Sequence, residues 1–173
     1  METKTYFSER QTQKQKWIWF VVWLIFLMSV FAIIKQVVLK SPIGNNPAPN
    51  WALYLITGFS ISLVIFLYRN VLLTRITNQG VHYRFIPFHR KERIVSWKQI
   101  KKAYVRVYDP LPEYGGWGLR TVDTKGNGIA INMMGKIGLQ LELYNGENIL
   151  IGTQLGEKVK KVIDSLDYNT QII

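Results

Sequence analysis

A glycine-rich run around a single tryptophan is the most distinctive candidate binding site in this sequence. Tyr114, Gly115, Gly116, Trp117 and Arg120 lie within seven positions of one another. Glycine permits positive φ angles and close backbone approach, and tryptophan offers a large apolar body with an N–H donor. The run favours one of two structures: a ligand or partner groove lined by Tyr114 and Trp117, or a bulged strand whose glycines accommodate a packed indole ring.

A second candidate site is a set of six cations, which we name the basic belt: Arg90, Lys91, Arg93, Lys98, Lys101 and Lys102. The chain carries a net charge of +11, and the excess lies in residues 69–106, directly after an apolar segment. Each cation close to an anionic bilayer contributes about 1 kcal/mol of binding. The belt therefore predicts contact with anionic lipid headgroups, unless it only sets membrane topology and solubility. The pattern does not favour nucleic acid as a partner, because the charge lies beside the apolar segment and no recognition motif occurs.

The sequence offers little for catalysis or metal binding. His82 and His89 are the only histidines, and on one strand they would point to opposite faces. Cysteine is absent, which excludes disulfides and thiolate ligands. The carboxylates are scattered, and no nucleophile-elbow, P-loop or HExxH pattern occurs. We therefore expect no catalytic residue, no metal site and no cofactor.

Two uncharged apolar segments must position these candidate sites. They cover residues 17–34 and 51–68, and 18 residues of helix extend about 27 Å, close to a hydrocarbon core of roughly 30 Å. Neither segment has the polar stripe of a helix buried in a soluble protein. Residues 40–50 between them contain three prolines and a glycine, as is typical of a turn. The sequence predicts a transmembrane helical hairpin.

The distribution of positive charge predicts the orientation of this hairpin. Four cations precede the first segment and six closely follow the second, whereas the connecting loop carries two. Positively charged flanks remain in the cytoplasm. Both termini are therefore expected inside and residues 40–50 outside.

After the second apolar segment, the hydrophobic pattern changes to a period of two. That period with one apolar face is typical of half-buried antiparallel strands. Asn145-Gly146 predicts a two-residue hairpin turn, and residues 109–116 form the longest irregular loop. The predicted strands cover about residues 72–77, 81–88, 92–96, 102–108, 117–122, 128–132, 137–144 and 148–153.

The chain ends with a predicted amphipathic helix over residues 155–166, whose apolar positions follow helical spacing. The fold class is thus an α+β membrane protein, in which a two-helix hairpin precedes a small antiparallel β-barrel or orthogonal sandwich with a C-terminal capping helix. The predicted division of the chain is a cytoplasmic tail or helical extension at 1–16, a hairpin at 17–71 with spans of about 17–39 and 51–71, a cytoplasmic domain at 72–168 and a tail at 169–173.

Strands followed by one closing helix resemble the pleckstrin-homology fold. The runs at 114–120, 135–142 and 145–154, with the GNNPAP loop at 44–49, make the chain similar to a family of small bacterial two-span membrane proteins with a bacterial pleckstrin-homology-like domain. The likeness extends from Trp17 to about Asp167. It implies a fold and a place in the bacterial cytoplasmic (inner) membrane, but no reaction. The short, uncharged turn at 78–80 lacks the basic signature of phosphoinositide-binding members.

The function predicted from the sequence is that of a non-catalytic, membrane-anchored interaction module at the cytoplasmic surface. It would bind a protein or peptide partner, or a membrane complex, through an exposed sheet edge, and the anchor would raise its effective concentration. An alternative is sensing of anionic lipid or a small ligand through the basic belt. A membrane enzyme acting on a lipid or envelope precursor is less favoured, since it would need a polar cleft with a perturbed carboxylate or histidine.

Overall fold

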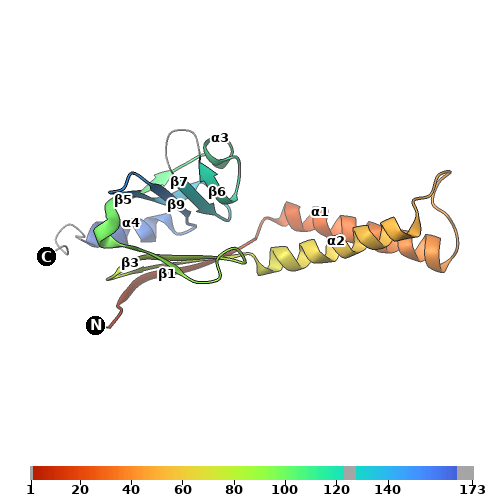
Figure 1. Cartoon of the computed structure of the whole chain (residues 1–173), viewed down its shortest axis with the longest axis horizontal. Coiled ribbons are helices and arrows are strands. Elements are labelled where there is room, and N and C mark those ends of the chain that lie inside the picture. The colour runs from red at the N-terminus through yellow and green to blue at the C-terminus, as the bar shows by residue number, and fades with distance from the viewer. Residues whose placement is uncertain (1, 123–127, 167–173) are drawn as a thin grey trace. The chain divides into compact units, whose positions relative to one another are not determined.

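The computed structural model describes residues 2–122 and 128–166 (Figure 1). The chain divides into two compact units. One, the helical unit, consists of residues 14–69. The other, the sheet unit, combines residues 1–13 with residues 70–173.

Two apolar helices make up the helical unit. Helix α1 (Lys16–Ile33) continues into a π-helical turn, η1 (Ile34–Val38), and α2 (Asn50–Arg69) follows the loop. Most of their large apolar side chains are exposed, such as Phe20 at 69% and Phe59 at 70%. Both helices are long and apolar enough to cross a membrane, which confirms the predicted pair of apolar helices.

Small and aromatic side chains hold the two helices together. Ser29 and Ser60 are buried, and each hydroxyl donates a hydrogen bond to a carbonyl of its own helix. Small side chains permit close approach of helices in lipid. Near the other end of the pair, the rings of Trp19 and Tyr68 lie 4.5 Å apart between centroids. The helical unit is therefore an antiparallel hairpin with its own packing.

The first sheet of the sheet unit has the order β1-β2-β3-β4, and every pair is antiparallel. Its strands are β1 (Thr5–Thr12), β2 (Val71–Thr77), β3 (Gly80–Ile86) and β4 (Arg93–Ser96). Strand β1 precedes the apolar helices in the sequence and pairs with the strand that follows them, with Thr12 opposite Val71.

The prediction that residues 1–16 form a tail or a helical extension was wrong, because residues 5–12 form a strand. The inward-facing positions of β1 are Phe7, Glu9 and Gln11, and all three are buried. Two of these three side chains are polar, so the strand lacks the apolar alternation by which the other strands are predicted.

Hydrogen bonds explain why polar side chains are buried on β1. The Glu9 carboxylate accepts the Thr153 hydroxyl at 2.6 Å and the Gln154 backbone N–H at 2.9 Å. The Gln11 amide donates to the carbonyl of Gly152 at 2.7 Å. Buried polar groups are tolerated when they are paired in this way. Strand β1 therefore joins the first sheet to the segment that leads into the last helix.

The second sheet has the order β5-β8-β9-β7-β6. Its strands are β5 (Ile100–Val107), β6 (Gly118–Val122), β7 (Gly128–Asn132), β8 (Ile137–Leu143) and β9 (Asn148–Gly152). The eight strands predicted after the apolar segments are confirmed, with bounds within two residues. Their predicted antiparallel pairing was wrong in one place, because β7 and β9 are parallel. The chain turns at Asn145-Gly146, and β9 then lies between β8 and β7. The alternation of apolar residues along a strand does not indicate which strands lie beside it.

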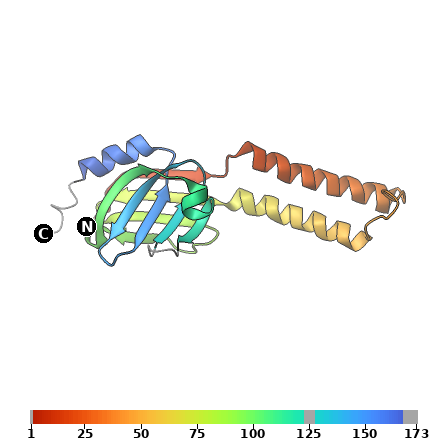
Figure 2. The same cartoon turned by 90° about the horizontal axis from the view of Figure 1, so that it is seen from above.

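The two sheets lie face to face, with their strands crossing at an angle (Figure 2). One hydrophobic core fills the space between them and includes Leu72, Phe85, Leu139 and Ile151. Among the described residues, no strand pairing joins the two sheets. The fold class is thus confirmed as α+β, with two apolar helices and mainly antiparallel sheets.

Helix α4 (Gly156–Ser165) covers one side of this sandwich. It contacts β1 of the first sheet and β5 and β8 of the second. Its apolar residues Val159 and Ile163 are buried, and its lysines lie on the exposed side. The predicted closing helix is therefore confirmed.

A short helix, α3 (Pro110–Tyr114), replaces part of the irregular loop predicted at 109–116. Proline stands at its first position, and Gly115 ends it with a φ of 67°. Proline at a helix start and a left-handed glycine after its end are known helix signals. Both signals are present in the sequence, but a helix of five residues is too short to show a helical period of apolar residues, so the segment was predicted as a loop.

Candidate functional site

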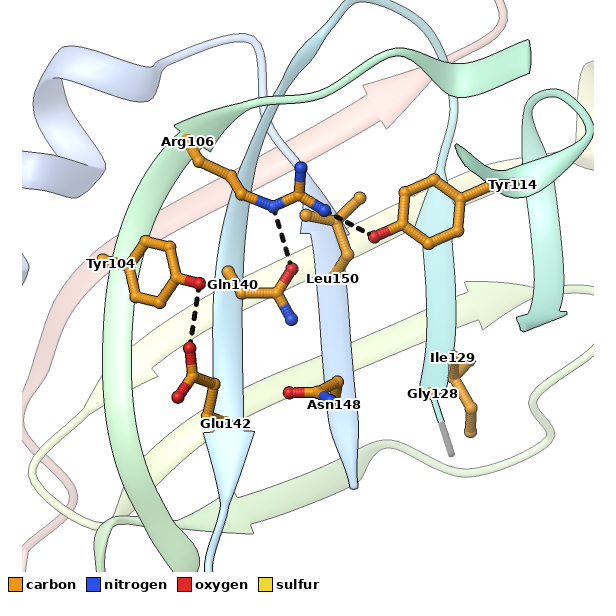
Figure 3. Close-up of a pocket in the computed structure, with 9 residues that line it drawn as sticks. All are labelled: Tyr104, Arg106, Tyr114, Gly128, Ile129, Gln140, Glu142, Asn148 and Leu150. Atoms are coloured by element: carbon orange, nitrogen blue, oxygen red, sulfur yellow. Dashed lines mark hydrogen bonds between the residues drawn. The ribbon is translucent and has the colours of Figure 1, made fainter. Parts of the chain in front are cut away.

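The outer face of the second sheet carries a groove of about 490 Å³ (Figure 3). Pockets of this volume are within the range that binds small ligands or short segments. Strands β5, β8, β9 and β7 form its floor, and α3 contributes one wall. The lining residues are Tyr104, Arg106, Tyr114, Gly128, Ile129, Gln140, Glu142, Asn148 and Leu150.

Strand periodicity positions most of these side chains. On β5, Ala103 and Val105 pack in the core, so Tyr104 and Arg106 face outward. On β8, the leucines face the core and leave Gln140 and Glu142 on the outer face, opposite their β5 neighbours. The groove is thus a consequence of the same alternation that builds the core.

Arg106 is the cation among the lining residues, and protein groups already bind it. Its Nε donates to Gln140 Oε1 at 3.1 Å, and its Nη2 donates to the Tyr114 hydroxyl at 2.7 Å and contacts Glu113 Oε2 at 2.8 Å. Burial lowers the pKa of Arg106, but the hydrogen bond that it donates to Glu113 and the coulombic effects of Tyr114 and Glu113 outweigh burial and raise the pKa overall. Arg106 is therefore a charged, fixed wall of the groove.

Helix α3 is held against the sheet through Glu113 and Tyr114. The Arg106 hydrogen bond lowers the pKa of Glu113, whose other oxygen accepts the Asp109 backbone N–H at 2.7 Å. The Tyr114 ring packs edge-on against Tyr108, with 5.8 Å between centroids. Both contacts fix the position of the wall that Tyr114 forms.

Tyr104 and Glu142 form a second hydrogen-bonded pair across β5 and β8. The Tyr104 hydroxyl donates to Glu142 Oε1 at 2.9 Å. Burial, and then this hydrogen bond, raise the pKa of Tyr104. The hydroxyl therefore stays protonated and acts as a hydrogen-bond donor, which is a binding role and not that of a base.

Amide and carboxylate groups remain available inside the groove. Figure 3 shows the Gln140 amide nitrogen directed toward Asn148, while Gln140 Oε1 is bound to Arg106. Glu142 lines the groove and uses Oε1 of its carboxylate to accept the Tyr104 hydroxyl. Arg106 is matched by Glu113. The β5 partner of Glu142 is Lys102, whose Nζ lies 4.9 Å from the centroid of the Tyr104 ring. Such a surface can hydrogen-bond a polar ligand through its amide and carboxylate groups.

The glycine run contributes one residue to this groove. Tyr114 lines it, and Gly115 and Gly116 provide the sharp turn out of α3 with φ angles of 67° and 122°. Both glycines adopt left-handed backbone conformations that other residues rarely adopt. Their role is to position Tyr114 and to redirect the chain toward β6.

The other two members of the run lie outside the groove lining. The indole N–H of Trp117 donates to the carbonyl of Gly135 at 3.2 Å. Arg120 is exposed, and its Nε donates to the carbonyl of Trp117 at 3.3 Å. The structure therefore brings Tyr114 to the candidate site and leaves Trp117 and Arg120 beside it.

The six residues of the basic belt are all exposed but do not form one patch. One group lies at the turn between β3 and β4 and consists of Arg90, Lys91 and Arg93. The other lies past the opposite end of β4, in the 3-10 helix η2 (Trp97–Gln99) and at the start of β5, and consists of Lys98, Lys101 and Lys102. Arg93 lies opposite Tyr83, and Ser96 lies opposite Gly80, so the four residues of β4 separate the two groups by roughly 13 Å along the sheet.

Both histidines take part in local hydrogen bonds and are buried. His82 lies between the Thr77 hydroxyl at 2.9 Å and the Glu92 carboxylate at 3.3 Å. The Phe85 backbone N–H donates to His89 Nδ1 at 3.2 Å. Across residues 2–122 and 128–166, no group of three or more potential ligand side chains is arranged to hold a metal ion.

Sequence reasoning missed most of the groove residues. The alternation on β5 and β8 identified Tyr104, Arg106, Gln140 and Glu142 as outward-facing, and solvent was the simplest environment for them. Polar residues of these types are also expected on a solvated strand face, so the pattern carried no local signal of a groove. These four side chains meet across the neighbouring strands β5 and β8, whereas the wall formed by Tyr114 depends on α3, which was predicted as loop.

Comparison with protein-family models, with curated proteins and with solved structures found no match. The interpretation of the groove therefore rests on the residues of this chain and their geometry.

Proposed function

We propose that this protein is a membrane-anchored binding module whose groove on the outer face of the second sheet holds a short polar peptide segment of a protein partner. The observation that carries the proposal is the set of open polar groups on Gln140, Glu142 and Asn148, beside a cation that is already paired. A preformed concave site with a few convergent polar groups is the usual form of a binding site.

Membrane anchoring is supported by the apolar helices and by the pairing of β1 with β2. Residues 5–12 precede the helices and residues 71–77 follow them, yet the two strands are neighbours in one sheet. Both strands must therefore lie on the same side of any membrane that the helices cross. Two crossings return the chain to the side from which it started, whereas a single crossing would separate the strands. The positive flanks favour the cytoplasmic side, and the resemblance described above favours the bacterial cytoplasmic membrane.

A peptide fits the chemistry of the groove better than an anionic headgroup does. Peptide bonds offer alternating N–H donors and C=O acceptors, which primary amides such as Gln140 and Asn148 can match. Glu142 favours a basic side chain on the ligand and disfavours phosphate. Leu150 supplies an apolar floor for an aliphatic part of the segment.

The two-layer core closed by a C-terminal helix agrees with the proposed similarity to pleckstrin-homology-like domains, which mostly bind ligands without catalysis. Two features differ from the expected pattern: the parallel pair β7–β9 and the strand β1 contributed from before the helices. The proposal of a binding module therefore rests on the groove, since a fold can host many functions.

The test is peptide selection with the full-length protein in mild detergent. Random peptides displayed on phage are selected, and binding of the recovered peptides is measured by fluorescence anisotropy. Gln140→Ala and Asn148→Ala are each expected to weaken binding about tenfold, since each leaves a bound peptide group without its partner. Gln154→Ala, at an exposed glutamine outside the groove lining, is the matched control and should have no effect. Equal affinities for the Gln140 and Gln154 variants would refute the groove as the peptide site.

A further inference from the structure

The chain leaves the first sheet for both apolar helices from the same end. Thr12 and Val71 are paired, and beyond them residues 13–15 lead to α1 while Asn70 alone separates α2 from β2. Val71 is also paired with Ile86, the last residue of β3. The turn between β3 and β4 therefore lies at the end of the sheet where the chain connects to the helices.

This turn presents an exposed aromatic ring among cations. Phe88 is 53% exposed, although one side of its ring stacks on Phe85 with 5.3 Å between centroids. Arg90 and Lys91 follow within the turn, and Arg93 begins β4. We name Phe88, Arg90, Lys91 and Arg93 the turn cluster.

Hydrogen bonds hold the turn in place. His89 donates its backbone N–H to the carbonyl of Phe85 at 2.7 Å and accepts the Phe85 N–H on Nδ1. Burial, and then the charge of Arg93, lower the pKa of His89, which keeps Nδ1 available as an acceptor. Arg84 Nε donates to the His89 carbonyl at 3.3 Å. The position of Phe88 is thus fixed by the sheet.

The carboxylate within the turn does not neutralise the cluster. Glu92 is bound by Arg75, with 2.6 Å between Oε2 and Nη2, and by His82 at 3.3 Å. Although partial burial raises the pKa of Glu92, these two partners lower it overall. The negative charge of Glu92 is therefore paired with Arg75 and His82 of the sheet, and the three cations of the turn cluster keep a net positive charge.

We propose that the turn cluster is a contact surface for an anionic lipid bilayer, in which Phe88 enters the headgroup layer and the three cations lie among lipid phosphates. The proposal rests on the membrane anchor of the proposed function but is independent of the peptide groove. Aromatic side chains favour the interfacial layer, and clustered cations are attracted to anionic lipid within a Debye length. The turn lies at the end of the sheet from which the chain leaves for both apolar helices, so only a few residues of chain separate that end of the sheet from the proposed anchor.

The test uses the full-length chain in nanodiscs of phosphatidylcholine alone or mixed with phosphatidylglycerol. The native chain has no cysteine, so a single introduced cysteine takes one environment-sensitive fluorophore. The label at Phe88→Cys is expected to shift to shorter wavelength and to be quenched by lipid-borne quenchers, more strongly with phosphatidylglycerol. The label at Lys98→Cys, from the other group of the basic belt, should stay in water.

Charge variants provide the matched control. Arg90→Gln, Lys91→Gln and Arg93→Gln together should remove most of the quenching at position 88, whereas Lys98→Gln, Lys101→Gln and Lys102→Gln remove the same charge and should leave it unchanged. High salt should weaken the quenching of the otherwise native chain in the same way, which tests the contact without altering the fold. A water-exposed label at position 88, or equal effects of the two triple variants, would overturn the proposal.

A third reporter separates this contact from the anchor itself. A label at Leu27→Cys, in α1, is expected to be quenched by lipid in both kinds of nanodisc. Quenching at position 27 without quenching at position 88 would refute the turn cluster alone. Absence of quenching at position 27 would refute the membrane anchor, and the contact proposal with it.

Discussion

At the residue scale, Tyr108 supports the wall of the groove that Tyr114 forms. Its side chain is 2% exposed, and it packs with Ala130 and Leu150 in a small cluster on the outer face of the second sheet. Burial raises the pKa of its hydroxyl from 10.0 to about 12. Ionisation of Tyr108 in the folded state would place a charge in this cluster, directly below α3.

This shift predicts a specific loss of stability in alkali. The phenol is neutral when protonated, so a raised pKa means that the unfolded chain loses the proton first. The stabilisation is complete below about pH 10 and is lost as the pH rises toward 12, by about 2 to 3 kcal/mol at most. The free energy of unfolding, measured against pH, should fall less steeply in this range for Tyr108→Phe. Tyr144→Phe, at an exposed tyrosine, should follow the native curve, and identical curves for both variants would contradict the assignment.

At the scale of elements, β1 is a strand stabilised by polar contacts on its buried side. Replacing Glu9 by alanine leaves the Thr153 hydroxyl and the Gln154 N–H without their acceptor. A buried donor without a partner costs about 1 to 3 kcal/mol. We expect Glu9→Ala to lower the free energy of unfolding by about that amount, as measured by denaturant titration of the detergent-solubilised chain. Ser8→Ala, at the adjacent exposed position, is the control, and similar losses from both would argue against the role of Glu9.

The same strand shows how far sequence patterns predict this fold. Strands with an apolar inner face, such as β8 with Leu139 and Leu141, are predicted almost to their ends because burial of alternate side chains creates the signal. Strand β1 has Glu9 and Gln11 at the equivalent positions, so its burial depends on partners more than 140 residues away. Neither these long-range partners nor the parallel neighbour of β7 leaves a local pattern.

The candidate site was predictable to a lesser degree than the strands. The outward direction of Arg106 and Gln140 follows from strand alternation alone. The matched charge and the fixed position of Arg106 depend on Glu113 and Tyr114, which α3 brings back over the sheet. The basic belt shows the reverse case, because residues close together in the sequence are separated by the length of a strand.

At the scale of the whole molecule, the sheet unit is discontinuous in sequence. A domain beginning at residue 72, as the sequence predicted, would lack β1 and expose the edge of β2 that β1 covers. It would also lose the contacts of Glu9 and Gln11 with the segment before α4. An uncovered edge strand is a site of aggregation. The fragment 72–173 is therefore expected to be poorly folded and to aggregate.

The missing strand can be restored without the helices. Thr12 and Val71 are paired neighbours in an antiparallel ladder, so a short turn can join them. A chain in which an Asn-Gly turn replaces residues 14–69 should be a soluble monomer with cooperative thermal unfolding and dispersed amide resonances. Size-exclusion chromatography, thermal melts and two-dimensional NMR of this chain and of fragment 72–173 provide the comparison. Equal stability and dispersion of the two would show that β1 is dispensable, whereas a folded joined chain beside an aggregated fragment would establish that the helical unit is inserted between two adjacent strands of one domain.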